Sequence, residues 1–141
     1  MIRKFRKEDE EEVLQIWLSA SVEAHDFIAA SFWESKLDEM KGSYLPSSDT
    51  YVYEDAKGKV TGFISLVDNY IAAVFVAPEE QGKGVGAQLI GKAKELFDTL
   101  ELSVYTRNKK AVAFYQKHGF TKKEEKVEAN TGEQETIMIY S

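Results

Sequence analysis

A glycine-dense turn between an apolar strand and a helix is the part of this sequence best suited to chemistry. Residues Ile71 to Val76 form an apolar run, Pro78 ends it, and Gly82, Gly84 and Gly86 follow in close succession. Glycine lets the backbone turn tightly and leaves N–H groups uncovered by side chains. The next helix directs its free N-terminal N–H groups and positive dipole end at the same turn. The sequence therefore predicts an anion site, of the kind that binds phosphate or pyrophosphate.

Two common phosphate motifs do not account for this turn. A P-loop requires Ser or Thr after its Gly-Lys pair, but Lys83 is followed by Gly84. A dinucleotide fingerprint requires an acidic residue at the end of the next strand, where this chain has Thr106 and Arg107. Too few residues follow the turn to complete a doubly wound domain. A P-loop is excluded, and dinucleotide binding remains a distant alternative.

Written as Gln81-x-x-Gly84-x-Gly86, the turn resembles the pyrophosphate loop of the GNAT superfamily, the acyl-CoA N-acyltransferases. A second block at residues 108–120, Asn-Lys-Lys-Ala-Val-Ala-Phe-Tyr-Gln-Lys-His-Gly-Phe, is similar to the family signature Asn-x-x-Ala-x-x-Phe-Tyr-x-x-x-Gly-Phe at every fixed position. A predicted helix and a predicted strand separate the two blocks, as the family's topology requires. The resemblance extends over essentially the whole chain.

The predicted elements follow the order of a GNAT domain. Apolar periodicity and turn residues predict strands at residues 2–5, 51–54, 60–67, 70–76, 102–104, 122–128 and 135–140. Helices are expected at residues 8–20, 21–40 (broken near His25), 84–100 and 108–119, and a loop at 42–49. Asn108 is expected to cap the last helix and Gly119 to end it. The acidic run at 8–12 is interpreted as a solvated helix start. The resemblance implies one α/β (α+β) domain over residues 1–141, with a mixed, mostly antiparallel central sheet flanked by helices.

The composition excludes several classes of function. The chain has 141 residues, 43% of them hydrophobic, which is enough to bury a core. It has no cysteine, so disulfides, thiolate metal sites and a cysteine nucleophile are excluded, and neither histidine has a ligand set nearby, so we expect no metal. A formal net charge of −6 argues against nucleic-acid binding. No run of apolar residues suits a signal peptide or a membrane span, so we expect a cytoplasmic protein without a membrane partner.

The resemblance implies that acetyl-CoA binds as a co-substrate. The strand before the turn would separate from its neighbour, and its unpaired backbone groups would hold the pantetheine arm. One N–H group among Phe75, Val76 and Ala77 would bind the oxyanion, and the turn would bind the pyrophosphate. Basic residues after the next strand could meet further phosphate or form a solvated patch: Arg107, Lys109 and Lys110. The expected cofactor-binding residues are Phe75, Val76, Ala77, Gln81, Gly82, Lys83, Gly84, Val85, Gly86, Asn108 and Tyr115.

Transfer of an acyl group from a thioester to an amine requires an acid for the thiolate and a base for the amine. Tyr115 matches the family's tyrosine, the usual general acid, and a phenol with a pKa of about 10 stays protonated at neutral pH. A buried structural tyrosine is the alternative. No motif identifies the base. We predict His25, because its resting pKa of about 6.5 suits proton acceptance, although a lone histidine is often structural; further candidates are Tyr70, Asp68 and Glu54.

We therefore expect an N-acetyltransferase that moves an acetyl group from acetyl-CoA to a primary amine by direct attack in a ternary complex. The acceptor remains open among a protein lysine or N-terminus, a polyamine, an amino acid and an antibiotic, and the acidic surface favours cationic acceptors. A non-catalytic acyl-CoA sensor or interaction module is the alternative, which the intact Tyr115 disfavours. The chain is expected to be a monomer or a homodimer.

Overall fold

A seven-stranded sheet in the order β1-β2-β3-β4-β5-β7-β6 organises the chain in the computed structural model, which describes residues 1–141. Every pair of neighbouring strands is antiparallel except β4 and β5, which are parallel. The sheet is thus mixed and mostly antiparallel, as the resemblance implied. Its strands are β1 (Ile2–Lys4), β2 (Asp49–Glu54), β3 (Val60–Val67), β4 (Tyr70–Val76), β5 (Leu100–Tyr105), β6 (Thr121–Val127) and β7 (Gln134–Tyr140).

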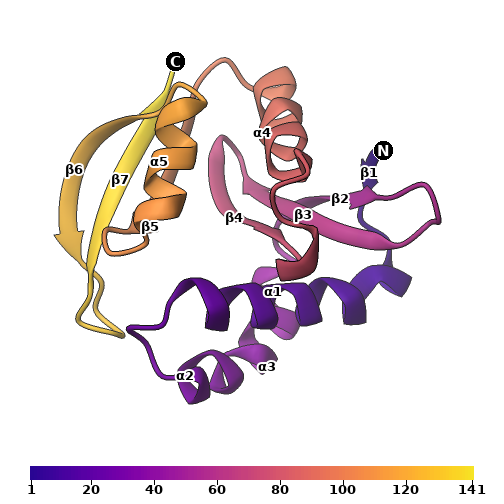
Figure 1. The fold of residues 1–141 in the computed structure, drawn as a ribbon, viewed down its shortest axis with the longest axis horizontal. Coiled ribbons are helices and arrows are strands. Elements are labelled where there is room, and N and C mark those ends of the chain that lie inside the picture. Colours follow the sequence, from indigo (N-terminus) through magenta and orange to yellow (C-terminus); the bar gives the residue numbers. More distant parts are fainter.

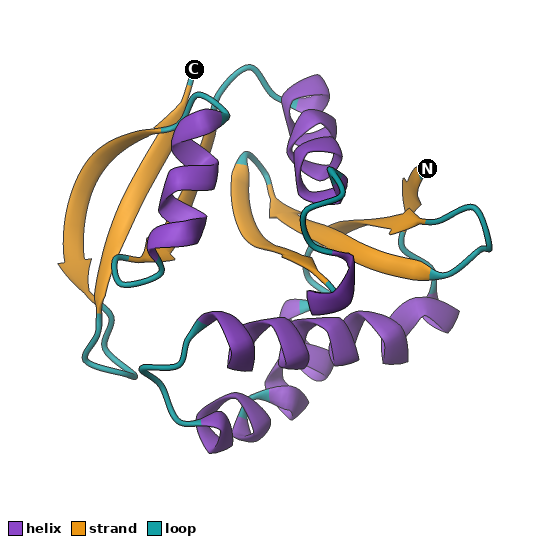
Figure 2. Cartoon of the chain, in the orientation of Figure 1, coloured by secondary structure: helices purple, strands orange, loops and turns teal.

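Helices pack on both faces of the sheet (Figures 1 and 2). On one face, Leu89 and Ile90 of α4 are fully buried in a core cluster with Ile64, and α5 packs against the same cluster. On the other, Val13 of α1 is fully buried with Phe63. None of the helices combines the length and apolar composition that a bilayer-spanning segment requires. The helices are α1 (Glu10–Ala24), α2 (Ala30–Ser35), α3 (Leu37–Glu39), α4 (Val85–Leu96) and α5 (Lys109–Lys117), with short helical turns η1 (Lys7–Asp9), η2 (Met40–Tyr44) and η3 (Pro78–Glu80).

Several boundaries differ from those expected, among them the end of α1, which continues to Ala24 instead of ending at residue 20. Helix α4 ends at Leu96, because Phe97 is extended (φ −139°, ψ 138°), and Leu100 instead opens β5 opposite Tyr140. Leu100 is buried in β5, and an apolar residue suits the buried face of a helix as well as that of a strand. Its apolar character alone therefore does not distinguish a helix end from a strand start. Residues 40–44, expected in part as a loop, form a π-helical turn with Met40 buried. The break expected near His25 is confirmed, since α1 ends at Ala24 and α2 begins at Ala30.

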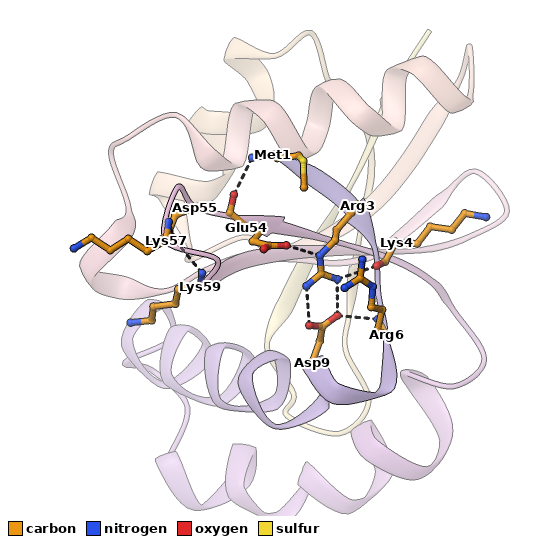
Figure 3. Close-up of polar contacts among 9 residues, drawn as sticks. All are labelled: Met1, Arg3, Lys4, Arg6, Asp9, Glu54, Asp55, Lys57 and Lys59. Atoms are coloured by element: carbon orange, nitrogen blue, oxygen red, sulfur yellow. Dashed lines mark hydrogen bonds and ion pairs between the residues drawn. The ribbon is translucent and has the colours of Figure 1, made fainter.

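Arg3 joins β1 to the start of α1 and to β2 (Figure 3). Its guanidinium donates to both carboxylate oxygens of Asp9, at 2.8 and 2.9 Å, and its Nε donates to Glu54. Asp9 is 4% exposed and also accepts a hydrogen bond from the Arg6 N–H at 2.8 Å. The bonds from Arg3 hold the pKa of Asp9 below its ordinary value. One member of the acidic run is therefore a buried ion-pair partner, while Glu8 beside it is exposed as expected.

The parallel pair β4–β5 is unusually short. The two strands pair only at Tyr70–Glu101 and Ile71–Leu102. Beyond these residues they diverge, with β5, β7 and α5 on one side and β3, β4 and α4 on the other (Figure 1). The resemblance implied this separation, and it leaves one edge of β4 without a partner strand.

Replacing Asp9 by asparagine should lower the free energy of unfolding by about 2 to 3 kcal/mol, because a charged hydrogen-bonded pair at a buried position is weakened. Since the pKa of Asp9 is depressed, this stabilisation is present above its ordinary value of 3.8 and is lost as the pH falls through the folded-state pKa. Urea denaturation at pH 7 measures the loss. The matched control, Glu8→Gln, should change stability by less than about 0.5 kcal/mol. Equal effects of the two substitutions would contradict the anchoring role of Asp9.

Candidate active site

A cavity of about 900 Å³ opens where β4 and β5 diverge. Its size is that of a site for a small molecule or cofactor. The walls come from β4, β5, the glycine turn with the first turn of α4, α5, and the end of α1. Of the twelve residues predicted for the site, all line this cavity except Ala77 and Lys83. The fold therefore brings together motifs that are far apart in the sequence.

The glycine turn leaves backbone N–H groups free at the cavity. Gly82 (φ 83°) and Gly84 (φ 85°) adopt the left-handed conformation that favours glycine. A Cβ atom at either position would meet no atom within 4 Å, so backbone conformation and not space requires glycine here. Gly84 caps α4 without a side-chain hydrogen bond, so the first N–H groups of the helix have no capping partner. These groups lie where the sequence predicted an anion site.

The two side chains of the turn have different roles. Gln81 donates from Nε2 to the Val76 carbonyl oxygen at 3.1 Å and ties the turn to β4. The exposed Lys83 ammonium instead lies 2.9 Å from a Glu80 carboxylate oxygen. This hydrogen bond raises the pKa of Lys83 and keeps it a cation. For Lys83 to contact a phosphate directly, its pairing with Glu80 would have to change.

The backbone of β4 presents alternate N–H groups to the cavity. The Ala77 N–H donates to the Thr61 carbonyl oxygen at 2.8 Å, so this group is engaged in the sheet and is not free for an oxyanion. In an antiparallel pair, every second residue of a strand directs its N–H to the partner strand. Phe75, two residues before Ala77, is paired with Phe63 and therefore also directs its N–H to β3. Val76 directs its N–H to the gap, and so does Val74, which was not predicted.

Tyr115 lies on the α5 wall of the cavity. The helix begins at Asn108, whose side chain accepts a hydrogen bond from the Ala111 N–H at 3.3 Å, as the predicted cap requires. The rings of Phe114 and Phe120 pack against Tyr115 with centroid distances of 5.4 and 5.8 Å. Burial raises the pKa of Tyr115 well above its ordinary value. The phenol is thus a protonated group in the cavity wall at neutral pH.

His25 is a buried link between the end of α1 and the cap of α5. Its Nδ1 lies 2.9 Å from the Ser21 carbonyl oxygen, which can only accept, so Nδ1 carries the proton. Its Nε2 lies 3.3 Å from the Asn108 Nδ2 and accepts from it. The ring stacks on Trp33 at 5.0 Å, and burial lowers the pKa of His25. Both ring nitrogens are occupied, which favours a positioning role, and the general-base role of His25 stays a prediction.

The other proposed bases lie outside the cavity. The Tyr70 hydroxyl donates to Ser103 Oγ at 3.1 Å. Asp68 is exposed in the turn before β4, with φ 52°. Glu54 binds Arg3. Their positions do not support a contact with the reacting amine.

Three aromatic side chains and one carboxylate complete the far wall and were not among the predicted site residues. Trp17 is buried in the core, and it also lines the cavity. Trp33 and Tyr105 join it, with Glu135 beside Tyr105 in the paired strand. Residues 105 and 135 are adjacent only through the β5–β7 register, so no local sequence pattern could have identified them.

The sequence profile of the acetyltransferase (GNAT) domain matches residues 46–122, more than half of the chain. The chain belongs to the GNAT family. It is 33% identical over 121 residues to the peptidyl-lysine N-acetyltransferase YiaC of Escherichia coli, covering 85% of this chain and 82% of that protein. The solution structure of apo YjaB from Escherichia coli is similar, with TM-score 0.89, 27% identity, and 99% and 96% of the two chains covered.

The fold is shared more widely. The PaiA N-acetyltransferase of Thermoplasma acidophilum, solved in complex with coenzyme A, has TM-score 0.81 at 20% identity and covers 98% of its own chain and 100% of this one. The GNAT profile and the 33% identity to a named N-acetyltransferase show that this chain is an N-acetyltransferase. The solved structures show that it has the predicted mixed α/β fold.

Gly84→Ala should destabilise the enzyme by about 1 to 2 kcal/mol, because alanine is strained in the left-handed conformation. It should also weaken coenzyme A binding, because relief of the strain turns the free N–H groups away. Gly91→Ala is the matched control: it lies inside α4 with open space around a new Cβ. We expect it to stabilise the protein by about 0.5 to 1 kcal/mol without changing affinity. For each variant, denaturation measures the change in stability and calorimetric titration measures the affinity for coenzyme A. Unchanged affinity in Gly84→Ala would contradict the anion site.

Proposed function

We propose that this GNAT enzyme transfers the acetyl group of acetyl-CoA to a primary amine by direct attack in a ternary complex. The observation that carries the proposal is the shared cavity, which holds an uncapped helix N-terminus, the unpaired edge of β4 and the protonated Tyr115. The helix N-terminus is suited to phosphate, the edge of β4 to an extended arm and an oxyanion contact, and Tyr115 to proton donation. Without cysteine, the chain has no thiol to carry the acetyl group, which agrees with direct transfer.

The backbone holds the acetyl-CoA in this proposal. The N–H groups of residues 82–87 bind the pyrophosphate, where the positive end of α4 adds to the attraction. The unpaired edge of β4 hydrogen-bonds the pantetheine arm, with the thioester next to Val76. The Val76 N–H then stabilises the oxyanion that forms on the carbonyl, a contact worth about 3 to 4 kcal/mol in comparable sites.

Tyr115 supplies the proton for the departing thiolate. A thiol has a pKa of about 8.5, so the leaving group ends as the thiol at neutral pH, and Tyr115 still carries a proton there to donate as the carbon–sulfur bond breaks. Its ring is fixed by Phe114 and Phe120, which holds the hydroxyl in one place relative to the cavity.

We propose a protein lysine as the acceptor. The relative that shares 33% identity over most of its length is named a peptidyl-lysine N-acetyltransferase. The aromatic wall of Trp33 and Tyr105 is suited to the methylene chain of lysine, which can pack on apolar surfaces while its charged end stays polar. A formal net charge of −6 favours the approach of a cationic acceptor.

Tyr115→Phe should reduce kcat with acetyl-CoA and a lysine peptide by about 100-fold or more, because the acid is lost while its packing remains. It should keep acetyl-CoA binding, which at one hundred times Kd adds about 2.7 kcal/mol to the stability and raises Tm. Tyr44→Phe, at an exposed tyrosine of η2, is the control and should leave both unchanged.

Three results would count against the proposal. If acetyl-CoA gives no thermal shift while NADP does, the acetyl-CoA site is wrong. If acetyl-CoA binds but no amine is acetylated, the non-catalytic sensor is supported. If Tyr115→Phe turns over as fast as the native enzyme, the acid is another group.

A further inference from the structure

The geometry points to Glu135 as the group that takes the proton of the acceptor ammonium. This inference rests on the proposed amine acetylation and adds to it the base that no motif identifies. Glu135 lies on β7, in register with Tyr105 of β5 on one side and Lys126 of β6 on the other. It lines the cavity, and its half-buried carboxylate has no hydrogen bond or ion pair within the protein.

Glu135 is on the face of the sheet opposite α4 and α5. Leu102 and Val104 of β5 belong to the core cluster beneath those helices. Successive side chains of a strand point to opposite faces of the sheet, so Ser103 and Tyr105 project from the other face. Directly paired residues share a face, and Glu135 is paired with Tyr105. The glycine turn and α5 hold the acetyl-CoA side of the cavity, and Glu135 therefore lies on the side open to the acceptor.

The charges around Glu135 suit a proton acceptor. Burial and the neighbouring Glu128 raise the pKa of Glu135, while Lys126 opposes the shift without forming an ion pair. Burial and Glu128 raise the pKa of Tyr105, and the Glu135 carboxylate raises it further. The charge of Glu135 therefore acts on the aromatic wall of the cavity. A base with a raised pKa is closer in proton affinity to an amine.

The other ionisable groups of the cavity are already engaged or lie elsewhere. Both nitrogens of His25 hold hydrogen bonds, and Glu80 pairs with Lys83 at the glycine turn. His118 ends α5 against the Phe114 ring, beside Lys117 on the acetyl-CoA side, and Lys110 lies in the first turns of the same helix. Glu23, on the last turn of α1, is exposed to solvent. Among the carboxylates of the cavity, Glu135 alone is both half-buried and on the face of the acceptor.

The proton transfers balance with Glu135 in this role. One proton passes from the ammonium to the Glu135 carboxylate, and the neutral amine nitrogen bonds to the thioester carbon. The carbon–sulfur bond then breaks, and Tyr115 gives its proton to sulfur. The nitrogen loses its second proton, which restores Tyr115. Glu135 releases its proton to solvent, so each turnover yields an amide, a free thiol and one proton.

The test is the pH dependence of kcat/KM for Nα-acetyl-lysine methylamide with saturating acetyl-CoA. The native enzyme should show two ionisations: kcat/KM rises as Glu135 loses its proton, and it falls at higher pH as the substrate ammonium loses its own proton. Glu135→Gln should lower kcat/KM at pH 7 by about 100-fold or more and remove the lower ionisation, while that of the amine remains. The thermal shift with acetyl-CoA should be unchanged.

Two variants make the result specific. Glu124→Gln, an exposed carboxylate on β6, should keep both ionisations and native activity. His25→Asn, which can still donate to Ser21, should also keep both ionisations even if kcat falls. Glu135→Gln with both ionisations intact would overturn the inference alone, and so would loss of the lower ionisation in His25→Asn. A native enzyme that acetylates no amine would overturn both the inference and the proposed function.

Discussion

The separation of β4 from β5 after two paired residues is the constraint on which the site depends. Sheets normally pair their backbone groups, because an unpaired polar group away from water is costly. Here one edge of β4 is left unpaired, with the α4 N-terminus on one side and Tyr115 on the other. The same opening supplies the space for a ligand and the hydrogen-bonding groups that a thioester and its pantetheine arm need. A fully paired sheet would remove both.

The opening is spanned at its far end by side chains. His25 connects the end of α1 to the α5 cap through Asn108, and Phe27 lies under the Arg107 guanidinium at 4.8 Å. Arg107 in turn pairs with Glu133 of the β6–β7 hairpin at 3.3 Å. These contacts join the two halves of the sheet where the strands no longer do. The gap is therefore held at both ends, and a neutral His25 suits this link because its Nε2 must accept.

The parts predicted from sequence are those that local chemistry determines. The cap at Asn108 and the turn at Gly84 each follow from the residue type at one position and its immediate neighbours, and the structure confirms both. What could not be predicted depends on strand register: a shift of one residue decides whether Val76 or Ala77 offers its N–H to the gap. Glu135 is likewise placed beside Tyr105 only by pairing across the sheet.

The central claim is that the unpaired edge of β4 and the glycine turn together bind acetyl-CoA. Titration of the ¹⁵N-labelled protein with acetyl-CoA, followed by amide NMR, tests it most directly. The account predicts the largest shifts at Val74, Val76 and residues 82–87, with a smaller shift at Ala77, whose N–H is bound to Thr61. The largest shifts outside the gap, for example between α5 and β6, or equal shifts at Val76 and Ala77, would contradict it.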